Sequence, residues 1–160
     1  MKTSEANSDL DLTINRVIAA PRQTVWDAWA DPRSLEKWWL PGPATCRVLD
    51  LDLRAGGAFR TEMSEDGREY QPHLDACFLD VEEGRRIVFT TAVDSRWRPA
   101  EDGLLISAAI TLEEHPEGTS YNALVMHSTR AERDRHDELG FEEGWGTAIR
   151  QLGELVEPGA

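Results

Sequence analysis

Apolar and polar residues alternate in several short segments of the chain, which is the pattern of half-buried β-strands. The first such segment begins at Leu10 and ends at Ala20-Pro21, and the next places aspartates between Leu49, Leu51 and Leu53. Similar segments lie at 59–63, 74–81, 87–93, 104–112 and 120–128, with glycine-containing turns between most of them. Short strands at this spacing predict one meandering antiparallel sheet.

Two short helices are predicted between the first strand and the rest of the sheet. Residues 25–29 place apolar side chains at helical spacing after Pro21, a residue that is tolerated where a helix begins. Asp31-Pro32 ends this first helix. A second helix fits residues 34–39 and ends at the Pro-Gly-Pro sequence of 41–43.

A long amphipathic helix is predicted near the C-terminus, over roughly residues 138–156. Its apolar stripe consists of Phe141, Trp145, Ala148, Ile149, Leu152, Leu155 and Val156. Residues 130–138 mix charges of both signs, which favours a solvent-facing loop or the start of this helix. A lone antiparallel sheet needs a cover on its apolar face, so we expect the sheet to curl around this helix. The fold class is α+β, with one domain over residues 10–157 after a loose polar tail of residues 1–9.

Charge narrows the class of partner. The 17 basic and 30 acidic residues give a formal net charge of −13, and such a field repels nucleic acids and anionic lipid surfaces. No apolar run reaches the ~20 residues of a membrane span, and the polar first residues do not match a secretory signal. We therefore expect a cytoplasmic protein that neither binds nucleic acid nor inserts into a membrane.

The sequence contains no recognisable catalytic or metal-binding motif. Its four histidines lack metal-ligand spacing, Cys46 and Cys77 form no C-x-x-C pair, and there is no G-x-S-x-G elbow. Gly56-Gly57 is typical of a hairpin turn and lacks the further glycines of a nucleotide-binding loop. We therefore predict no catalytic residue, no metal and no cofactor.

Several motifs occur in the same order as in the START-like (SRPBCC) superfamily, whose members have the helix-grip fold. Within that superfamily the chain resembles the family related to the C-terminal domain of the activator of the Hsp90 ATPase. The segments that carry this resemblance are 29–32 (WADP), 38–41 (WWLP), 51–59 (LDLRAGGAF), 85–90 (RRIVFT) and 144–146 (GWG). The resemblance covers roughly residues 10–157. No segment resembles the co-chaperone's N-terminal domain, so we do not expect activation of a chaperone ATPase.

The resemblance implies an apolar cavity between the sheet and the closing helix. The residues that we expect to bind a ligand there are Trp38, Trp39, Phe59, Met63, Phe78, Phe89, Ile106, His127, Phe141 and Trp145. For each of them, packing within a filled core is the competing interpretation. For His127 a structural role at the end of a strand is the favoured one.

Three functions stay open at this stage. The preferred hypothesis is a carrier, sensor or sequestering protein for a small apolar molecule, and a homodimer is left open. The first alternative is a cyclase or hydratase acting on a polyketide-like or aromatic substrate, with His127, His73 or Asp80 as acid or base. The second alternative is a stress-response or co-chaperone-like interaction domain.

Overall fold

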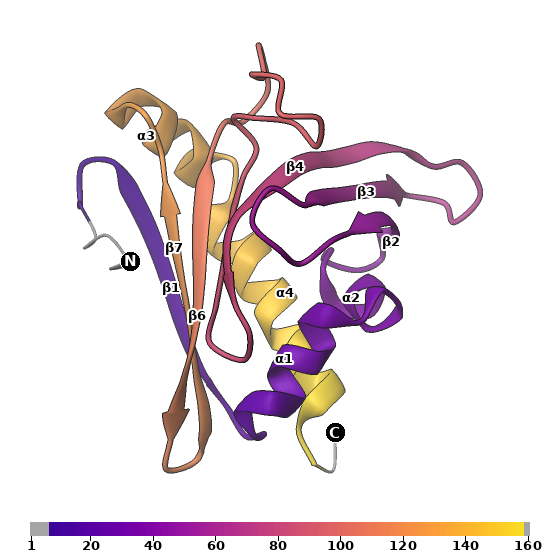
Figure 1. Ribbon diagram of the computed structural model, residues 1–160, viewed down its shortest axis with the longest axis vertical. Coiled ribbons are helices and arrows are strands. Elements are labelled where there is room, and N and C mark those ends of the chain that lie inside the picture. The colour runs from indigo at the N-terminus through magenta and orange to yellow at the C-terminus, as the bar shows by residue number, and fades with distance from the viewer. Residues whose placement is uncertain (1–6, 159–160) are drawn as a thin grey trace.

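The computed structural model describes residues 7–158, so most of the predicted polar tail, residues 1–9, lies outside the described residues. Strand β1 (Asp11–Ile18) is followed by helices α1 (Arg22–Ala30) and α2 (Pro32–Trp38) (Figure 1). The chain then forms β2 (Thr45–Leu51), β3 (Ala58–Ser64), β4 (Gln71–Glu82), β5 (Arg86–Thr90), β6 (Ser107–His115) and β7 (Gly118–Met126). Two helices follow, α3 (Arg130–Glu138) and α4 (Phe141–Val156).

All seven strands belong to one antiparallel sheet in the order β1-β7-β6-β5-β4-β3-β2. The pairing register shifts between β2 and β3, between β3 and β4, and between β4 and β5. Such bulges bend a sheet and increase its twist, and β2, β3 and β4 run across the direction of β1, β6 and β7 (Figure 1). The curved sheet encloses α4, which confirms the predicted α+β helix-grip fold.

The C-terminal helical region differs from the sequence prediction at its start. The structure has a separate helix, α3, where the charged run of residues 130–138 suggested a loop or the beginning of the long helix. Thr129 caps α3 by accepting a hydrogen bond from the backbone N–H of Glu132 at 3.1 Å. Gly140 has a φ of 97°, a left-handed conformation that ends one helix and lets the next leave in a new direction.

Two predicted strands are shorter than the alternation suggested. Strand β5 ends at Thr90 and β6 begins at Ser107, although apolar residues continue on both sides. Residues 91–106 instead form a loop, which we call the rim loop. Thr91 closes this loop, because its hydroxyl donates to the carbonyl of Leu104 at 2.8 Å and accepts the N–H of Ile106 at 2.9 Å.

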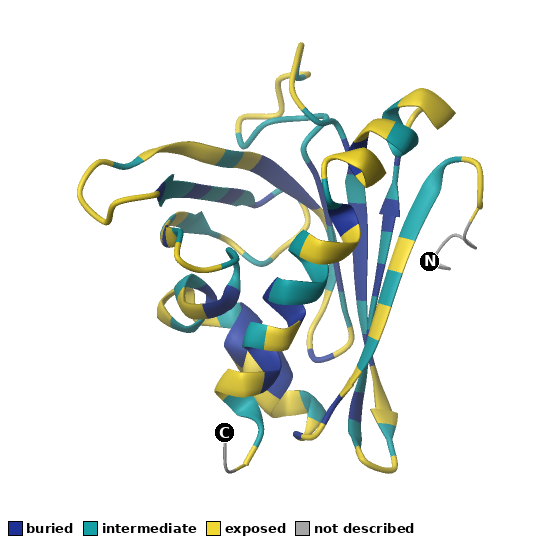
Figure 2. Cartoon of the chain, turned by 180° about the vertical axis from the view of Figure 1, so that it is seen from behind, coloured by how far each residue is buried: buried dark blue, intermediate teal, exposed yellow. Residues whose placement is uncertain are grey.

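The core is built from aromatic side chains at the end of the sheet that α1 and α2 cover. Trp29, Trp38, Phe59 and Phe78 are each at most 1% exposed. The indole N–H of Trp29 donates to the hydroxyl of Tyr121 at 2.9 Å, so even the polar atoms of this cluster are satisfied. Buried residues concentrate where α1, α4 and the strands face one another (Figure 2).

Candidate functional site

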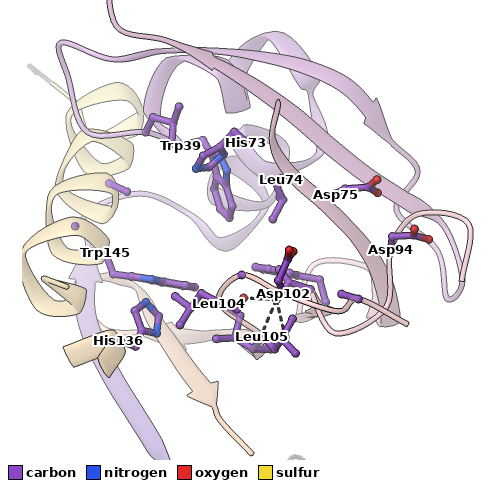
Figure 3. A pocket seen from close by; sticks show the side chains of 18 of the residues that line it. Trp39, His73, Leu74, Asp75, Asp94, Asp102, Leu104, Leu105, His136 and Trp145 are labelled. Carbon is purple, nitrogen blue, oxygen red and sulfur yellow. Dashed lines mark hydrogen bonds between the residues drawn. The ribbon is translucent and has the colours of Figure 1, made fainter. Parts of the chain in front are cut away.

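A cavity of about 1070 Å³ lies between the sheet and the first half of α4. Its wall consists of the end of α2, the first part of β4, the rim loop and the α3–α4 region (Figure 3), together with Phe89 of β5 and Tyr121 of β7. Its apolar lining includes Trp38, Trp39, Leu40, Pro41, Leu74, Phe89, Leu104, Leu105, Ile106, Trp145, Ala148 and Ile149. Its polar lining includes His73, Asp75, Thr91, Asp94, Arg98, Glu101, Asp102, Tyr121 and His136.

Five of the ten residues expected from the sequence lie in this lining: Trp38, Trp39, Phe89, Ile106 and Trp145. They come from four separate elements, and the bend of the sheet brings them together. On α4 the side chains of Trp145, Ala148 and Ile149 follow at steps of three and four, so they share one face of the helix. Gly144 also lies in the lining, and a Cβ placed on it would meet nothing within 4 Å. The cavity therefore has room next to this helix.

The other five expected residues lie outside the lining. Phe59 and Phe78 are fully buried and stack on each other with ring centroids 5.0 Å apart. Met63 lies near the end of β3 and is only partly buried. Phe141 packs between His136 and Trp145, with ring centroids 5.1 Å and 5.6 Å away. Phe59 packs against the lining residues Trp39 and Phe89, with ring centroids 5.3 Å from each, so the aromatic rings outside the lining support its wall.

His127 is the fifth of these, and it lies behind His136. The two rings are joined by a 2.9 Å hydrogen bond between Nε2 of His127 and Nδ1 of His136. Nδ1 of His127 lies 2.8 Å from the carbonyl oxygen of Leu10, just before β1. His136 is therefore the imidazole that reaches the cavity, and it sits beside Trp145 in Figure 3.

Burial lowers the pKa of His136 to about 4, and the neighbouring His127 adds to this effect. Asp137 acts in the opposite direction, but more weakly. His136 is only 7% exposed, so its charged form would have little solvent around it. At neutral pH this wall of the cavity carries an uncharged imidazole.

His73 occupies the opposite wall, near Trp39 (Figure 3). Its Nδ1 lies 3.0 Å from the hydroxyl of Thr61 on β3. Partial desolvation by the surrounding protein lowers the pKa of His73 as well. Both imidazoles of the lining therefore favour the neutral form.

The rim of the cavity is acidic. Four carboxylates (Asp75, Asp94, Glu101 and Asp102) and one guanidinium (Arg98) lie in the lining. Asp94 accepts the backbone N–H groups of Arg98 and Arg96, at 3.0 Å and 2.8 Å, and these bonds lower the pKa of its carboxyl. The rim therefore stays negatively charged at neutral pH.

Sequence reasoning did not find His136 or the acidic residues of the rim. His136 lies in a run of charged residues, and its neighbours in sequence are exposed, so no periodic pattern marks it as buried. Three of the four rim carboxylates, Asp94, Glu101 and Asp102, belong to the rim loop, whose path follows from single contacts. One of them is the 2.8 Å bond from the N–H of Ser95 to the carboxylate of Asp75.

Other reactive side chains do not form a site. Cys46 and Cys77 are free and buried, and burial raises the pKa of Cys46 to about 12, so it remains a thiol. Within residues 7–158, no three His, Cys, Asp or Glu side chains are grouped so that they could hold a metal ion. In the same part of the chain, no helix has the length and apolar character required to cross a bilayer.

Comparison with solved structures finds close relatives of the whole chain. Protein NE0264 from Nitrosomonas europaea is 40% identical, with a TM-score of 0.83 over 93% of this chain and 95% of that one. Protein CV1439 from Chromobacterium violaceum is 30% identical, with a TM-score of 0.72 over 93% and 99%. Protein Ms6760 from Mycobacterium smegmatis is 28% identical, with a TM-score of 0.78 over 96% and 94%.

The comparison with curated proteins gave no match. The family model described as "Activator of Hsp90 ATPase homolog 1-like protein" matches residues 19–157, which is most of the chain. This match agrees with the motifs, the curved seven-stranded sheet and the C-terminal helix. The protein belongs to the family of Activator of Hsp90 ATPase homolog 1-like (AHSA1) proteins.

Proposed function

We propose that this protein binds a small, largely apolar molecule between its sheet and α4, as a carrier, sensor or sequestering protein. The observation that carries the proposal is the cavity of about 1070 Å³, with indole and aliphatic side chains in its wall. Ligand pockets are typically concave and mostly apolar, with a few placed polar groups. The placed polar groups of the lining include the two neutral imidazoles, His73 and His136, and the hydroxyls of Thr91 and Tyr121.

The charge of the rim narrows the class of ligand. A carboxylate or phosphate entering past Asp75, Asp94, Glu101 and Asp102 would be repelled, and Arg98 is the one cation in the lining. The net charge of −13 acts in the same direction over the whole surface. We therefore expect a neutral or cationic ligand to bind more tightly than an anion of the same size.

Titration with a neutral aromatic probe, N-phenyl-1-naphthylamine, tests the proposal. We expect saturable quenching of tryptophan emission with a Kd in the micromolar range, on the order of −8 kcal/mol. Trp145→Ala should weaken binding about tenfold, because it removes an indole from the wall. Leu155→Ala truncates a 40% exposed side chain of the same helix outside the lining, and it should leave the Kd unchanged.

The absence of saturable binding to the folded wild-type protein would contradict the proposal. Equal weakening by the two variants would also contradict it, since the effect would then not arise from the cavity.

The enzyme alternative would depend on a single side chain. Of the three acid–base candidates, only His73 lies in the lining. Asp80 is paired with Arg86 at 2.8 Å on β4 and β5, and His127 is separated from the cavity by His136. Turnover of an aromatic or polyketide-like substrate that is lost in His73→Gln would favour this alternative over the binding function.

A further inference from the structure

The two buried histidines form a hydrogen-bonded chain that leads from the backbone to the cavity. Its first member is the carbonyl oxygen of Leu10, which lies 2.8 Å from Nδ1 of His127. Its second link is the 2.9 Å contact between Nε2 of His127 and Nδ1 of His136. The rings are 7% exposed or less, so these contacts are sheltered from water.

The carbonyl at one end fixes the direction of every hydrogen bond in the chain. A carbonyl oxygen only accepts, so Nδ1 of His127 must carry the proton. In the neutral ring Nε2 of His127 is then the acceptor, and Nδ1 of His136 must donate to it. The neutral form of His136 consequently has an unprotonated Nε2.

The opposite direction of the hydrogen bond between the two rings would require a charged His127. If Nε2 of His127 donated to His136, His127 would carry protons on both nitrogens. Neither ring forms an ion pair with a carboxylate among the residues that the structure describes, and Asp137 is the one acid that raises the pKa of His136. A buried imidazolium without a paired anion is costly. The neutral arrangement is therefore the stable one.

Nε2 of His136 is left with no hydrogen-bond partner within residues 7–158, although the residue itself belongs to the cavity lining. Its ring is held from both sides, by His127 and by Phe141 with a centroid distance of 5.1 Å. Trp145 lies next to it in the wall (Figure 3). The cavity therefore presents one oriented hydrogen-bond acceptor beside an aromatic surface.

We infer that Nε2 of His136 selects ligands that carry a hydroxyl or N–H donor on an apolar ring, such as a neutral phenol or a cyclic alcohol. The donor of the ligand binds Nε2, while its ring packs near Trp145. An ether or ketone of the same shape brings only acceptors, and these leave the Nε2 lone pair unpaired once the ligand has displaced water from it. This inference rests on the proposed function, because it names the ligand class for the same cavity.

A pair of probes that differ only in the donor tests the inference, namely 2-naphthol and 2-methoxynaphthalene in calorimetric titrations. We expect wild type to bind the naphthol about tenfold more tightly, and loss of that preference in His136→Asn. Asparagine can still donate to His127 from the position of Nδ1, but it has no atom at the position of Nε2. His136→Gln returns an acceptor oxygen near that position and should restore part of the preference.

His115→Asn is the matched control, since His115 ends β6 and lies outside the cavity lining. It should leave the preference unchanged. A ¹⁵N NMR spectrum of the ring nitrogens gives an independent readout, and we expect Nε2 of His136 to be unprotonated at pH 7.

The outcomes separate the two proposals. Equal affinity for the two probes, or a preference that survives His136→Asn, would overturn the selection by His136 while the binding function stands. A protonated Nε2 in the NMR spectrum would overturn it as well. Failure of both probes to bind would remove the proposed function, and this inference with it.

Discussion

The two halves of α4 face the same sheet with the same amphipathic stripe, but only one of them is packed against a solid core. At the closed end, where residues 150–156 meet α1, α2 and β1, Trp29 and Leu152 are completely buried. At the open end, Gly144, Trp145, Ala148 and Ile149 line the cavity, and Trp145 is only partly buried. The cavity therefore does not arise from the helix alone.

The difference lies in what covers the concave face of the sheet beside the helix. Helices α1 and α2 insert Trp29 and Trp38 at the closed end, and these indoles pack on each other with centroids 5.6 Å apart. At the open end the corresponding cover is the rim loop, whose Asp94, Glu101 and Asp102 cannot fill apolar space without losing their hydration. One end of the curved sheet is therefore filled by aromatic residues, and its other end borders the cavity.

Trp29→Ala should produce the largest loss of stability, about 3–5 kcal/mol. The substitution leaves a cavity in the closed end and removes the donor to the buried hydroxyl of Tyr121. Urea denaturation measures the change, and Trp97→Ala is the control, since Trp97 is 67% exposed. A loss for Trp29→Ala no larger than that for Trp97→Ala would mean that the closed end is not a solid core.

The sequence was sufficient to predict the closed end. Its apolar residues lie in helical periodicities, so the inward faces of α1 and α4 were predicted through Trp29 and Leu152, which are completely buried, whereas Leu155 of the same predicted stripe is 40% exposed. The end of the first helix at Asp31-Pro32 and the glycine turns between strands were also predicted correctly, because these residues act through local backbone geometry.

The open end could not be predicted in the same way. The position of the rim loop depends on contacts between distant residues, such as the indole N–H of Trp97 donating to the carbonyl of Gly56 at 2.9 Å. Met63 stays only partly buried near the end of β3, although alternation predicts that it shares the buried face of Phe59. The burial of His136 follows from its contact with His127, nine residues earlier. These are tertiary effects, and alternation along a single segment does not report them.

Acidification should destabilise the folded protein, because His136 at the open end is held in its neutral form. The pKa of His136 is about 4 in the folded state and near 6.5 in a model peptide. Between these values the unfolded chain binds more protons, so stability falls as pH falls. We expect this residue to account for a loss of about 2 kcal/mol between pH 7 and pH 5.

The measurement is a comparison of urea denaturation at the two pH values in wild type and His136→Asn. The variant lacks the titrating ring, so between pH 7 and pH 5 it should lose about 2 kcal/mol less stability than wild type. The same dependence in both proteins would show that His136 is not held in its neutral form by burial.

Trp145→Ala should cost less than Trp29→Ala, about 1–2 kcal/mol, although both remove an indole. The ring of Trp145 is partly buried and borders a space that is already open, so its removal creates little new cavity. Urea denaturation measures this loss beside that of Trp29→Ala. A loss of about 4 kcal/mol would mean that the open end is packed as tightly as the closed end, and the comparison between them would fail.

The smallest effect comes from one substitution made at both ends of α4, Gly144→Ala and Gly153→Ala. Replacing a helical glycine by alanine stabilises a helix by roughly 0.5–1 kcal/mol. At Gly144 a Cβ meets nothing within 4 Å, so we expect the full gain in thermal and urea denaturation. At Gly153 it would lie 3.0 Å from the guanidinium of Arg16 and 3.1 Å from the carboxylate of Glu157, which form an ion pair at 3.7 Å. Displacing this pair offsets the gain, so Gly153→Ala should be close to neutral. An equal gain in both variants would mean that Arg16 and Glu157 can move aside without a loss of stability. Tight packing at the closed end would then be limited to the aromatic cluster.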